Sequence, residues 1–384
     1  MQHFYFDHNA TTPVAPEVLE TMVSCLGQVY GNASSIHYFG QAAKQKLEAA
    51  RRQVAALIHA NPAEVVFTSG GTEADNLALL GTVRAAGRPH AHLIISAIEH
   101  AAVLASAAQL EREGVAVTRL PVGSEGTVDP EDVRRAMRPG TVLVSIMHAN
   151  NELGTVQPIA EIAIIAHEAG VPLHADGVQA LGKIAVDVNA LGVDLYSMSG
   201  HKLYAPKGVG ALYVRKGTKL APTSFGGHHE RDRRPGTENV PAIVALGVAC
   251  ELAGRTLAAE SERLAALRDR LESNLLGHIP GTGVNGAGAN RTPNTTNVYF
   301  DSIDGEAMVI ALDLRGFAVS TGSACSSGAI TPSHVLTALG LSADRARSSL
   351  RFSLGRSTTA EQVDALVDAL EASVTHLRRI SVHA

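Results

Sequence analysis

The feature that most limits the fold is a pattern repeated through residues 64–214. A short apolar run ends in a polar tip, and a stretch with helical spacing follows. The runs are Glu64–Thr68, His92–Ser96, Val115–Leu120, Thr141–Met147, Val171–His174, Leu195–Ser199 and Gly210–Val214. Strands that alternate with helices in this way predict an α/β fold with a mostly parallel sheet, covered by helices on both faces. Ligands of such sheets bind at the carboxyl ends of the strands, where the polar tips lie.

The pattern changes after residue 240. A long amphipathic helix is predicted there, and its apolar face carries Leu257, Leu264, Leu267, Leu271 and Leu275. The glycine-rich segment Gly281–Gly288 is predicted to be a loop. Shorter strands and helices follow, which is typical of an α+β unit. We therefore predict a large α/β domain at residues 16–250 and a small α+β domain made of residues 1–15 and 251–384.

The segment around Lys202 carries the first chemical signal. An alternating apolar run ends in Ser199-Gly-His-Lys202, and a loop with Pro206 and Gly208 leads to the next strand. A lysine at a strand end, partly withdrawn from water and flanked by hydroxyl and imidazole groups, is placed to react with a carbonyl compound. A surface lysine in a turn is the alternative interpretation.

Two other polar tips fit an anionic ligand and its counter-charge. Ser69-Gly-Gly-Thr72 separates a strand from a helix start, so backbone N–H groups can bind a phosphate, although Thr72 can also serve as a helix N-cap. Ser199 and His201 would add donors to the same phosphate. Asp176 ends an apolar strand and needs a cationic partner, either a protonated pyridine nitrogen or an arginine.

Gln179 and His100 complete this set of candidates. Gln179 can reach the same ligand as Asp176 if a helical turn begins there, and His100 can either stack on an aromatic ring or cap its helix. A phosphate cradle, a carboxylate for a ring nitrogen, a histidine and a strand-end lysine together indicate pyridoxal 5'-phosphate as the cofactor.

At this point the chain resembles the cysteine desulfurases that serve iron–sulfur cluster assembly, in the class V aminotransferase family of fold type I pyridoxal-phosphate enzymes. The resemblance extends from Phe6-Asp-His-Asn-Ala-Thr-Thr-Pro13 to Ser348-Ser-Leu-Arg-Phe-Ser-Leu-Gly355. Its most specific motifs are Ser199-Gly-His-Lys202, Gly236-Thr-Glu-Asn239 and Gly322-Ser-Ala-Cys-Ser-Ser-Gly328. It implies a seven-stranded, mostly parallel sheet in the large domain, and a homodimer.

The resemblance also implies a role for each candidate residue. Lys202 would bind the cofactor covalently, Asp176 would pair with its ring nitrogen, and His100 would stack on the ring and assist proton transfer. Gln179 and Asn151 would contact the cofactor hydroxyl, and Asn151 and Arg351 the substrate. The phosphate would be held by Gly71, Thr72, Ser199, His201 and, from the neighbouring subunit, Thr237. Cys325 would accept the sulfur of L-cysteine, leaving L-alanine.

Cys325 differs from the other two cysteines in its surroundings. Cys25 and Cys250 lie among apolar residues of predicted helices, where cysteine is usually a small core residue. Cys325 lies in Thr321–Ala329, a segment without a bulky side chain. We expect this loop to be exposed and mobile, as a thiolate must be that attacks a substrate sulfur and carries it to an acceptor protein. The acceptor would be an iron–sulfur scaffold or another sulfur acceptor, with tRNA thiolation as a second destination.

Other functions remain open at this stage. The same cofactor and fold can support transamination or selenocysteine cleavage, and the Cys325 loop disfavours a plain aminotransferase. A metal-dependent hydrolase using His100, His148, His174, Asp176 and His201 lacks the spacing of known metal motifs, so we predict no metal site. A non-catalytic sulfur carrier would have no use for Lys202.

The composition of the chain limits its possible ligands and its cellular location. The formal net charge is −5 and there is no long basic run, so we expect no direct nucleic-acid binding. No apolar run approaches the roughly 20 residues that span a bilayer, and the N-terminus lacks a signal-peptide pattern, so we expect no membrane contact and a cytoplasmic location.

Overall fold

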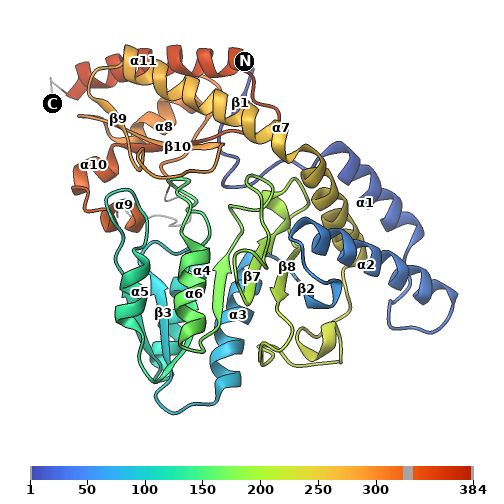
Figure 1. The fold of residues 1–384 in the computed structure, drawn as a ribbon. Coiled ribbons are helices and arrows are strands. Elements are labelled where there is room, and N and C mark those ends of the chain that lie inside the picture. The colour runs from blue at the N-terminus through green and yellow to red at the C-terminus, as the bar shows by residue number, and fades with distance from the viewer. Residues whose placement is uncertain (1, 323–331, 382–384) are drawn as a thin grey trace.

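The computed structural model describes residues 2–322 and 332–381, and its centre is a seven-stranded sheet (Figure 1). The strand order is β2-β8-β7-β6-β5-β3-β4. Every neighbouring pair is parallel except β8 with β2 and β7, so β8 alone runs against the others. The predicted α/β class and mostly parallel sheet are therefore confirmed. The strands are β2 (Val65–Thr68), β3 (His92–Ser96), β4 (Ala116–Leu120), β5 (Thr141–Ser145), β6 (Leu173–Asp176), β7 (Leu195–Ser199) and β8 (Gly210–Val214).

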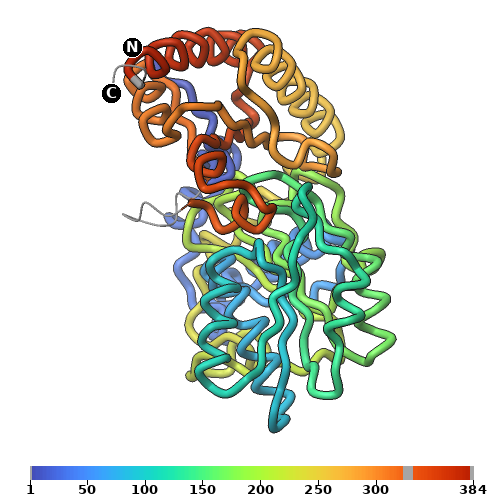
Figure 2. Tube along the Cα trace, turned by 90° about the vertical axis from the view of Figure 1, so that its left-hand side faces the viewer, coloured from blue at the N-terminus to red at the C-terminus, as the bar shows by residue number. Residues whose placement is uncertain are grey.

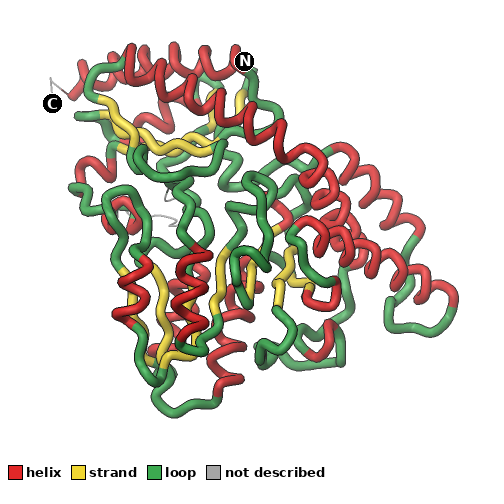
Figure 3. The backbone as a smooth tube through the Cα atoms, in the orientation of Figure 1, coloured by secondary structure: helices red, strands yellow, loops and turns green. Residues whose placement is uncertain are grey.

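Both faces of this sheet are buried, because successive strand residues point to opposite sides. Leu93 and Ile95 pack into one apolar cluster, with α3 (Gly71–Ala86) and α4 (Ala101–Arg112), whereas Ile94 packs into another. The second cluster includes α1 (Pro16–Gln28), α2 (Tyr38–Leu57), α5 (Pro130–Ala136), α6 (Ile159–Glu168) and part of α7 (Val240–His278). Figure 3 shows helices in front of and behind the strands.

A smaller unit lies above the carboxyl edge of the sheet (Figure 2). Its antiparallel sheet has the order β12-β10-β9, and β1 pairs with β11 in parallel beside it. It has its own core, formed with the second half of α7. Besides that part of α7, its elements are β1 (Phe4–Tyr5), β9 (Thr282–Val284), β10 (Thr295–Phe300), α8 (Gly305–Asp313), β11 (Phe317–Ala318), α9 (His334–Ala338), α10 (Ala343–Arg347), β12 (Ser349–Ser353) and α11 (Ala360–Ser381).

One local prediction needs correction. The glycine-rich segment predicted as a loop contains β9, because its Thr282–Val284 pairs with β10 as an edge strand. The predicted long helix after residue 240 is confirmed as α7, one continuous helix of 39 residues. The predicted boundary between residues 250 and 251 therefore falls inside α7, which belongs to both cores.

α7 is also the one described helix that is long and apolar enough to be a candidate membrane span. The sequence did not suggest a membrane span here, because only the first half of α7 is apolar and its second half is amphipathic. More than half of the apolar window, 56%, is buried inside the fold. Because α1 and α2 pack along it, α7 is a core helix.

Candidate active site

A cavity of about 680 Å³ lies at the carboxyl edge of the large sheet. It is lined by the ends of β6 and β7, the start of α3 and, from the small unit, Arg351 of β12. All predicted site residues except Thr237 and Cys325 lie in its wall. These are Gly71, Thr72, His100, Asn151, Asp176, Gln179, Ser199, His201, Lys202 and Arg351.

One end of the cavity is built to receive an anion. α3 begins at Gly71 with Gly70 as N-cap, and no side chain caps it, so Thr72 is not the N-cap that the sequence allowed. Its first N–H groups are therefore available to a ligand. The backbone is tightly packed there, since a Cβ on Gly71 would lie 2.8 Å from Val178 Cγ2 and 3.4 Å from the Ser199 side chain.

The side chains around this helix start are fixed by ion pairs and hydrogen bonds. Glu73 accepts from the Ser69 backbone N–H at 2.6 Å and pairs with Arg234 at 2.9 Å. His201 is hydrogen-bonded to Thr11 Oγ1 at 3.1 Å. Burial, and then the nearby charge of Lys202, lower the pKa of His201 to about 4, so its ring is neutral at pH 7.

Lys202 lies in a short 3-10 helix, Gly200–Lys202, directly after β7. Its Nζ donates to the carbonyl oxygens of Asn9 at 2.5 Å and Ala10 at 2.6 Å. These bonds hold the half-buried amine in the cavity wall and orient it toward the loop after β1. The surface-turn interpretation of Lys202 is therefore wrong.

Asp176 is the buried carboxylate of the site, at the end of β6. Its Oδ1 accepts from the Val178 N–H at 2.9 Å. Among residues 2–322 and 332–381, no lysine, arginine or histidine forms an ion pair with it within 4.0 Å, so the arginine alternative is not realised. Burial is the main cause that raises the pKa of Asp176, with His100 and Lys202 acting against it.

His100 caps its helix, which was one of the two alternatives that the sequence left open, and it also lines the cavity. It is the N-cap of α4, and its Nδ1 accepts from the Ala102 N–H at 3.1 Å. Its ring also lies in the cavity wall, close to Asp176. Helix capping therefore fixes the orientation of a histidine that faces the ligand space.

Gln179 is held by two residues that the sequence did not single out. Its Nε2 donates to the Asn9 carbonyl at 3.0 Å, and its Oε1 accepts from Lys183 Nζ. Lys183 also donates to Asn9 Oδ1 at 3.0 Å and is buried. Burial, followed by the charges of Lys202 and Arg351, lowers the pKa of Lys183 well below its usual value.

Arg351 is buried in the opposite wall with a carboxylate partner of its own. Its Nη2 pairs with Asp7 Oδ1 at 2.6 Å, and its Nη1 donates to the Asn151 carbonyl at 3.1 Å. Its Nε is buried and has no hydrogen-bond partner. Arg351 also lines the cavity, and a planar guanidinium there suits a ligand carboxylate.

Two predicted residues are not in the cavity wall of this chain. Thr237 is exposed, in the loop between the 3-10 helix at Glu230–Asp232 and α7. Cys325 lies outside the described residues. Cys25 and Cys250 are both buried, and burial raises the pKa of the Cys250 thiol to about 12, which confirms them as core cysteines.

Asp75, Lys183 and Asn9 are the site residues that sequence reasoning missed. Asp75 and Asn9 line the cavity, and Lys183 lies behind Gln179. A signal existed only for Asn9, which belongs to the polar turn after the first predicted strand. Asp75 lies inside a helix and Lys183 in a loop, where neither residue type indicates a ligand.

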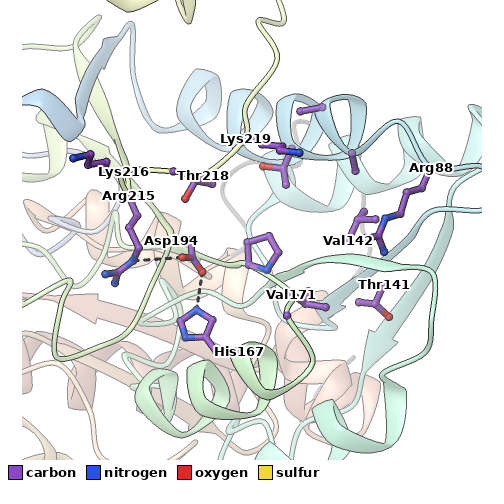
Figure 4. Close-up of a pocket in the computed structure, with 16 residues that line it drawn as sticks. Arg88, Thr141, Val142, His167, Val171, Asp194, Arg215, Lys216, Thr218 and Lys219 are labelled. Atoms are coloured by element: carbon purple, nitrogen blue, oxygen red, sulfur yellow. Dashed lines mark hydrogen bonds and ion pairs between the residues drawn. The ribbon is translucent and has the colours of Figure 1, made fainter.

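A second cavity, of about 630 Å³, lies at the amino edge of the same sheet (Figure 4). Its carboxylate, Asp194, pairs with His167 Nε2 at 2.9 Å and Arg215 Nε at 3.4 Å, and accepts from the Leu173 N–H at 2.9 Å. α3 ends there, at Ala86, so carbonyl oxygens rather than N–H groups face this edge. None of the predicted catalytic residues lines it.

Comparison with known proteins agrees with this geometry. The family model Aminotransferase class-V matches residues 4–366. Cysteine desulfurase IscS of Dictyoglomus turgidum is 47% identical over 377 residues, 98% of this chain and 96% of that protein. A solved structure named as a NifS-like protein has a TM-score of 0.92 at 36% identity and covers 98% of this chain and 100% of its own.

A third relative is a solved structure described as SspA in complex with cysteine. It has a TM-score of 0.82 and 39% identity, and covers 91% of this chain and 98% of its own. These likenesses confirm the predicted fold, fold type I of the pyridoxal-phosphate-dependent transferases. The chain belongs to the class V aminotransferase family and, within it, to the cysteine desulfurases.

Proposed function

We propose that this chain binds pyridoxal 5'-phosphate in the cavity at the carboxyl edge and transfers sulfur from L-cysteine to Cys325, leaving L-alanine. The observation that carries the proposal is Asp176, a buried carboxylate with no ion pair within 4.0 Å among the described residues. It shares the cavity wall with the Lys202 amine and an uncapped helix start.

The residues present fit this cofactor. The free N–H groups of α3 and the close packing at Gly71 suit a phosphate. Asp176 would keep a ring nitrogen protonated, and Lys202 offers the amine for a carbonyl carbon. When bound, the cofactor supplies an acceptor for the electron pair released at the substrate Cα.

The other steps belong to the side chains of this protein. The Arg351 guanidinium, which lines the cavity, would bind the substrate carboxylate, with Asn151 beside it. Lys202 would move the proton at the substrate Cα, and the neutral ring of His201 and the capped ring of His100 would border the reacting groups. Ser199 and Gln179 complete the polar wall.

Sulfur transfer balances without an outside oxidant. The Cys325 thiolate attacks the substrate sulfur, forming an S–S bond, and the C–S bond breaks with its electron pair going to carbon. Carbon is then protonated to give L-alanine, and Cys325 is left as a persulfide. We propose that this persulfide passes to an acceptor protein, with iron–sulfur cluster assembly as the destination supported by the names of the relatives.

We further propose that the enzyme is a homodimer in the cytoplasm. α1, the loop after it and the start of α2 expose apolar side chains that a second copy would cover, namely Leu19, Val23, Leu26, Tyr30, Ile36, Tyr38 and Phe39. Thr237, exposed and outside the cavity of its own chain, would reach the phosphate of the neighbouring subunit. The net charge of −5 gives no support for nucleic-acid binding.

The test compares the wild type with Cys325→Ser. Wild-type protein should show an absorption band of bound cofactor that changes when L-cysteine is added, and mass spectrometry should find one additional sulfur atom. Cys325→Ser should keep the spectral change and carry no additional sulfur, whereas Cys25→Ser and Cys250→Ser should still be sulfurated. Normal L-alanine formation by Cys325→Ser would refute the role of Cys325.

A further inference from the structure

Asp75 is a buried acid that the proposed reaction does not use. It lies on α3, where its helix neighbours Ala74, Leu77 and Ala78 are fully buried and apolar, and it is itself only 1% exposed. Its Oδ1 has no hydrogen-bond partner. An ionised carboxylate in such surroundings is costly unless a cation compensates it.

No described cation compensates Asp75. Its one ion-pair neighbour within 4.0 Å among the described residues is His174, at 3.6 Å. Burial lowers the pKa of His174 to about 3, so this ring is neutral. The titratable groups that act on Asp75 are Asp176 and Glu99, and both are acids whose ionisation would disfavour its anion.

Asp75 and Asp176 are close enough to share one negative charge. Oxygen atoms of the two carboxyl groups and a ring nitrogen of His100 lie within 4.8 Å of one another. Two buried carboxylates at this distance do not both ionise readily. Asp176 has the Val178 N–H and the nearby charge of Lys202 to favour its anion. Asp75 has only the Ser197 hydroxyl.

A chain of hydrogen bonds accommodates a proton on Asp75. Ser197 Oγ is hydrogen-bonded to His174 Nε2 at 2.9 Å, and His174 Nδ1 to Ser145 Oγ at 2.8 Å. If Asp75 donates to Ser197, then Ser197 donates to Nε2 and the neutral ring donates from Nδ1 to Ser145. Each of these hydrogen bonds then has one donor and one acceptor.

We propose that Asp75 is a positioning residue that stands behind Asp176 as a neutral carboxylic acid and leaves Asp176 as the single anion opposite the cofactor's ring nitrogen. This rests on the proposed function, because the ring nitrogen belongs to the cofactor. The part of the proposal that concerns Asp75 itself can be tested on the cofactor-free protein.

The first experiment measures thermal unfolding of cofactor-free wild type, Asp75→Asn and the matched control Asp194→Asn from pH 4 to pH 8. Burial and the charge of Asp176 raise the pKa of Asp75, so the native state keeps a proton that the unfolded chain loses. Wild-type stability therefore falls as the pH rises above about 4, and the uncharged amide of the Asp75→Asn variant removes this loss.

Asp75→Asn should accordingly gain stability relative to wild type as the pH rises. Asp194→Asn, which breaks the ion pair with Arg215 and alters the hydrogen bond with His167, should be less stable than wild type at pH 8. The groups facing Asp75 that also titrate are Asp176, Glu99, His100 and His174, and all are retained in Asp75→Asn. An Asp75→Asn protein that is less stable at pH 8, with the difference closing toward pH 4, would show an ionised Asp75 and overturn the proposal.

The second experiment measures the dissociation constant of pyridoxal 5'-phosphate by absorbance. Asp75→Ala should weaken binding about tenfold, and Asp75→Asn, which still donates to Ser197, should restore most of it. Equal binding by both variants would overturn the positioning role. Stabilisation of cofactor-free wild type by Zn²⁺, absent from Asp75→Asn, would also overturn it, since a metal rather than a proton would hold the cluster. Failure of wild type to bind the cofactor would refute the proposed function and leave the unfolding test valid.

Discussion

The two edges of the large sheet carry cavities of nearly equal size, about 680 Å³ at the carboxyl edge and 630 Å³ at the amino edge. Each has a buried aspartate among basic side chains. At the amino edge, Asp194 is paired with His167 and Arg215. At the carboxyl edge, Asp176 has only a backbone donor, and α3 presents unused N–H groups. Unsatisfied polar groups, rather than volume, therefore mark the edge that is prepared for a ligand.

The largest effect should come from the amine at the carboxyl edge. Lys202→Ala should abolish desulfuration and remove the absorption band of the lysine-bound cofactor, because no other described amine in the cavity wall is equivalent to it. Absorbance and L-alanine formation measure the two losses. A Lys202→Ala protein that keeps both the band and the activity would remove the chemical distinction between the edges.

Asp176→Asn should be nearly as severe. An amide cannot hold a ring nitrogen in its protonated form, so turnover should fall about 100-fold or more, while the fold remains intact. Steady-state kinetics measures the turnover, and circular dichroism shows whether the fold is intact. A rate equal to that of the wild type would mean that Asp176 only stabilises the local turn, by accepting the hydrogen bond from the Val178 N–H.

Arg351→Lys should affect substrate binding more than turnover. Lysine keeps the charge but loses the planar guanidinium, which serves Asp7 and Asn151 and lines the cavity. We expect KM for L-cysteine to rise about tenfold. Kinetics over a range of L-cysteine concentrations separates KM from kcat, and an unchanged KM would place the substrate carboxylate elsewhere.

Glu99→Gln should change stability and its pH dependence. Burial raises the pKa of Glu99 to about 8, although Ser96 and the Met147 N–H donate to it. The native state thus keeps a proton that the unfolded chain loses near pH 4.5, and wild-type stability falls as the pH rises toward about 8. Thermal stability of Glu99→Gln should fall less over this range. A slope equal to that of the wild type would show that Glu99 is ionised.

Asp194→Asn should have the smallest effect on activity. It lies at the opposite edge from Lys202, so kcat and KM should stay at wild-type values. Its lost ion pair and altered hydrogen bond should lower the free energy of unfolding by about 1 to 2 kcal/mol. Chemical denaturation and steady-state kinetics test both statements, and a marked loss of activity would mean that the amino-edge cavity takes part in function.

Sequence reasoning succeeded where local pattern decides structure. Strand tips such as Asp176 and Ser199-Gly-His-Lys202 follow alternating apolar runs, and parallel strands bring their ends to one edge. It failed where a polar residue is recruited by packing. Asp75 occupies a core-facing helical position, and Lys183 is buried by contacts with Asn9, which is far away in the chain.

The continuous helix α7 was also not predictable in full. Its first half is apolar on many faces because α1 and α2 cover it, so the amphipathic period appears only after about residue 257. The spacing of apolar residues reflects how a segment is buried. A helix that passes from one core to another therefore changes its apolar pattern along its length.

α7 finally restricts how sequences of this family can change. Its 39 residues give a length of about 58 Å, and no residue from Gly254 to Arg263, between the two cores, is fully buried. An insertion of one residue in this stretch would turn everything beyond it by about 100° and advance it by about 1.5 Å. Arg351 would then be displaced from the cavity wall that it shares with Lys202. We expect homologous sequences to accept many substitutions in this stretch but no single-residue insertions or deletions.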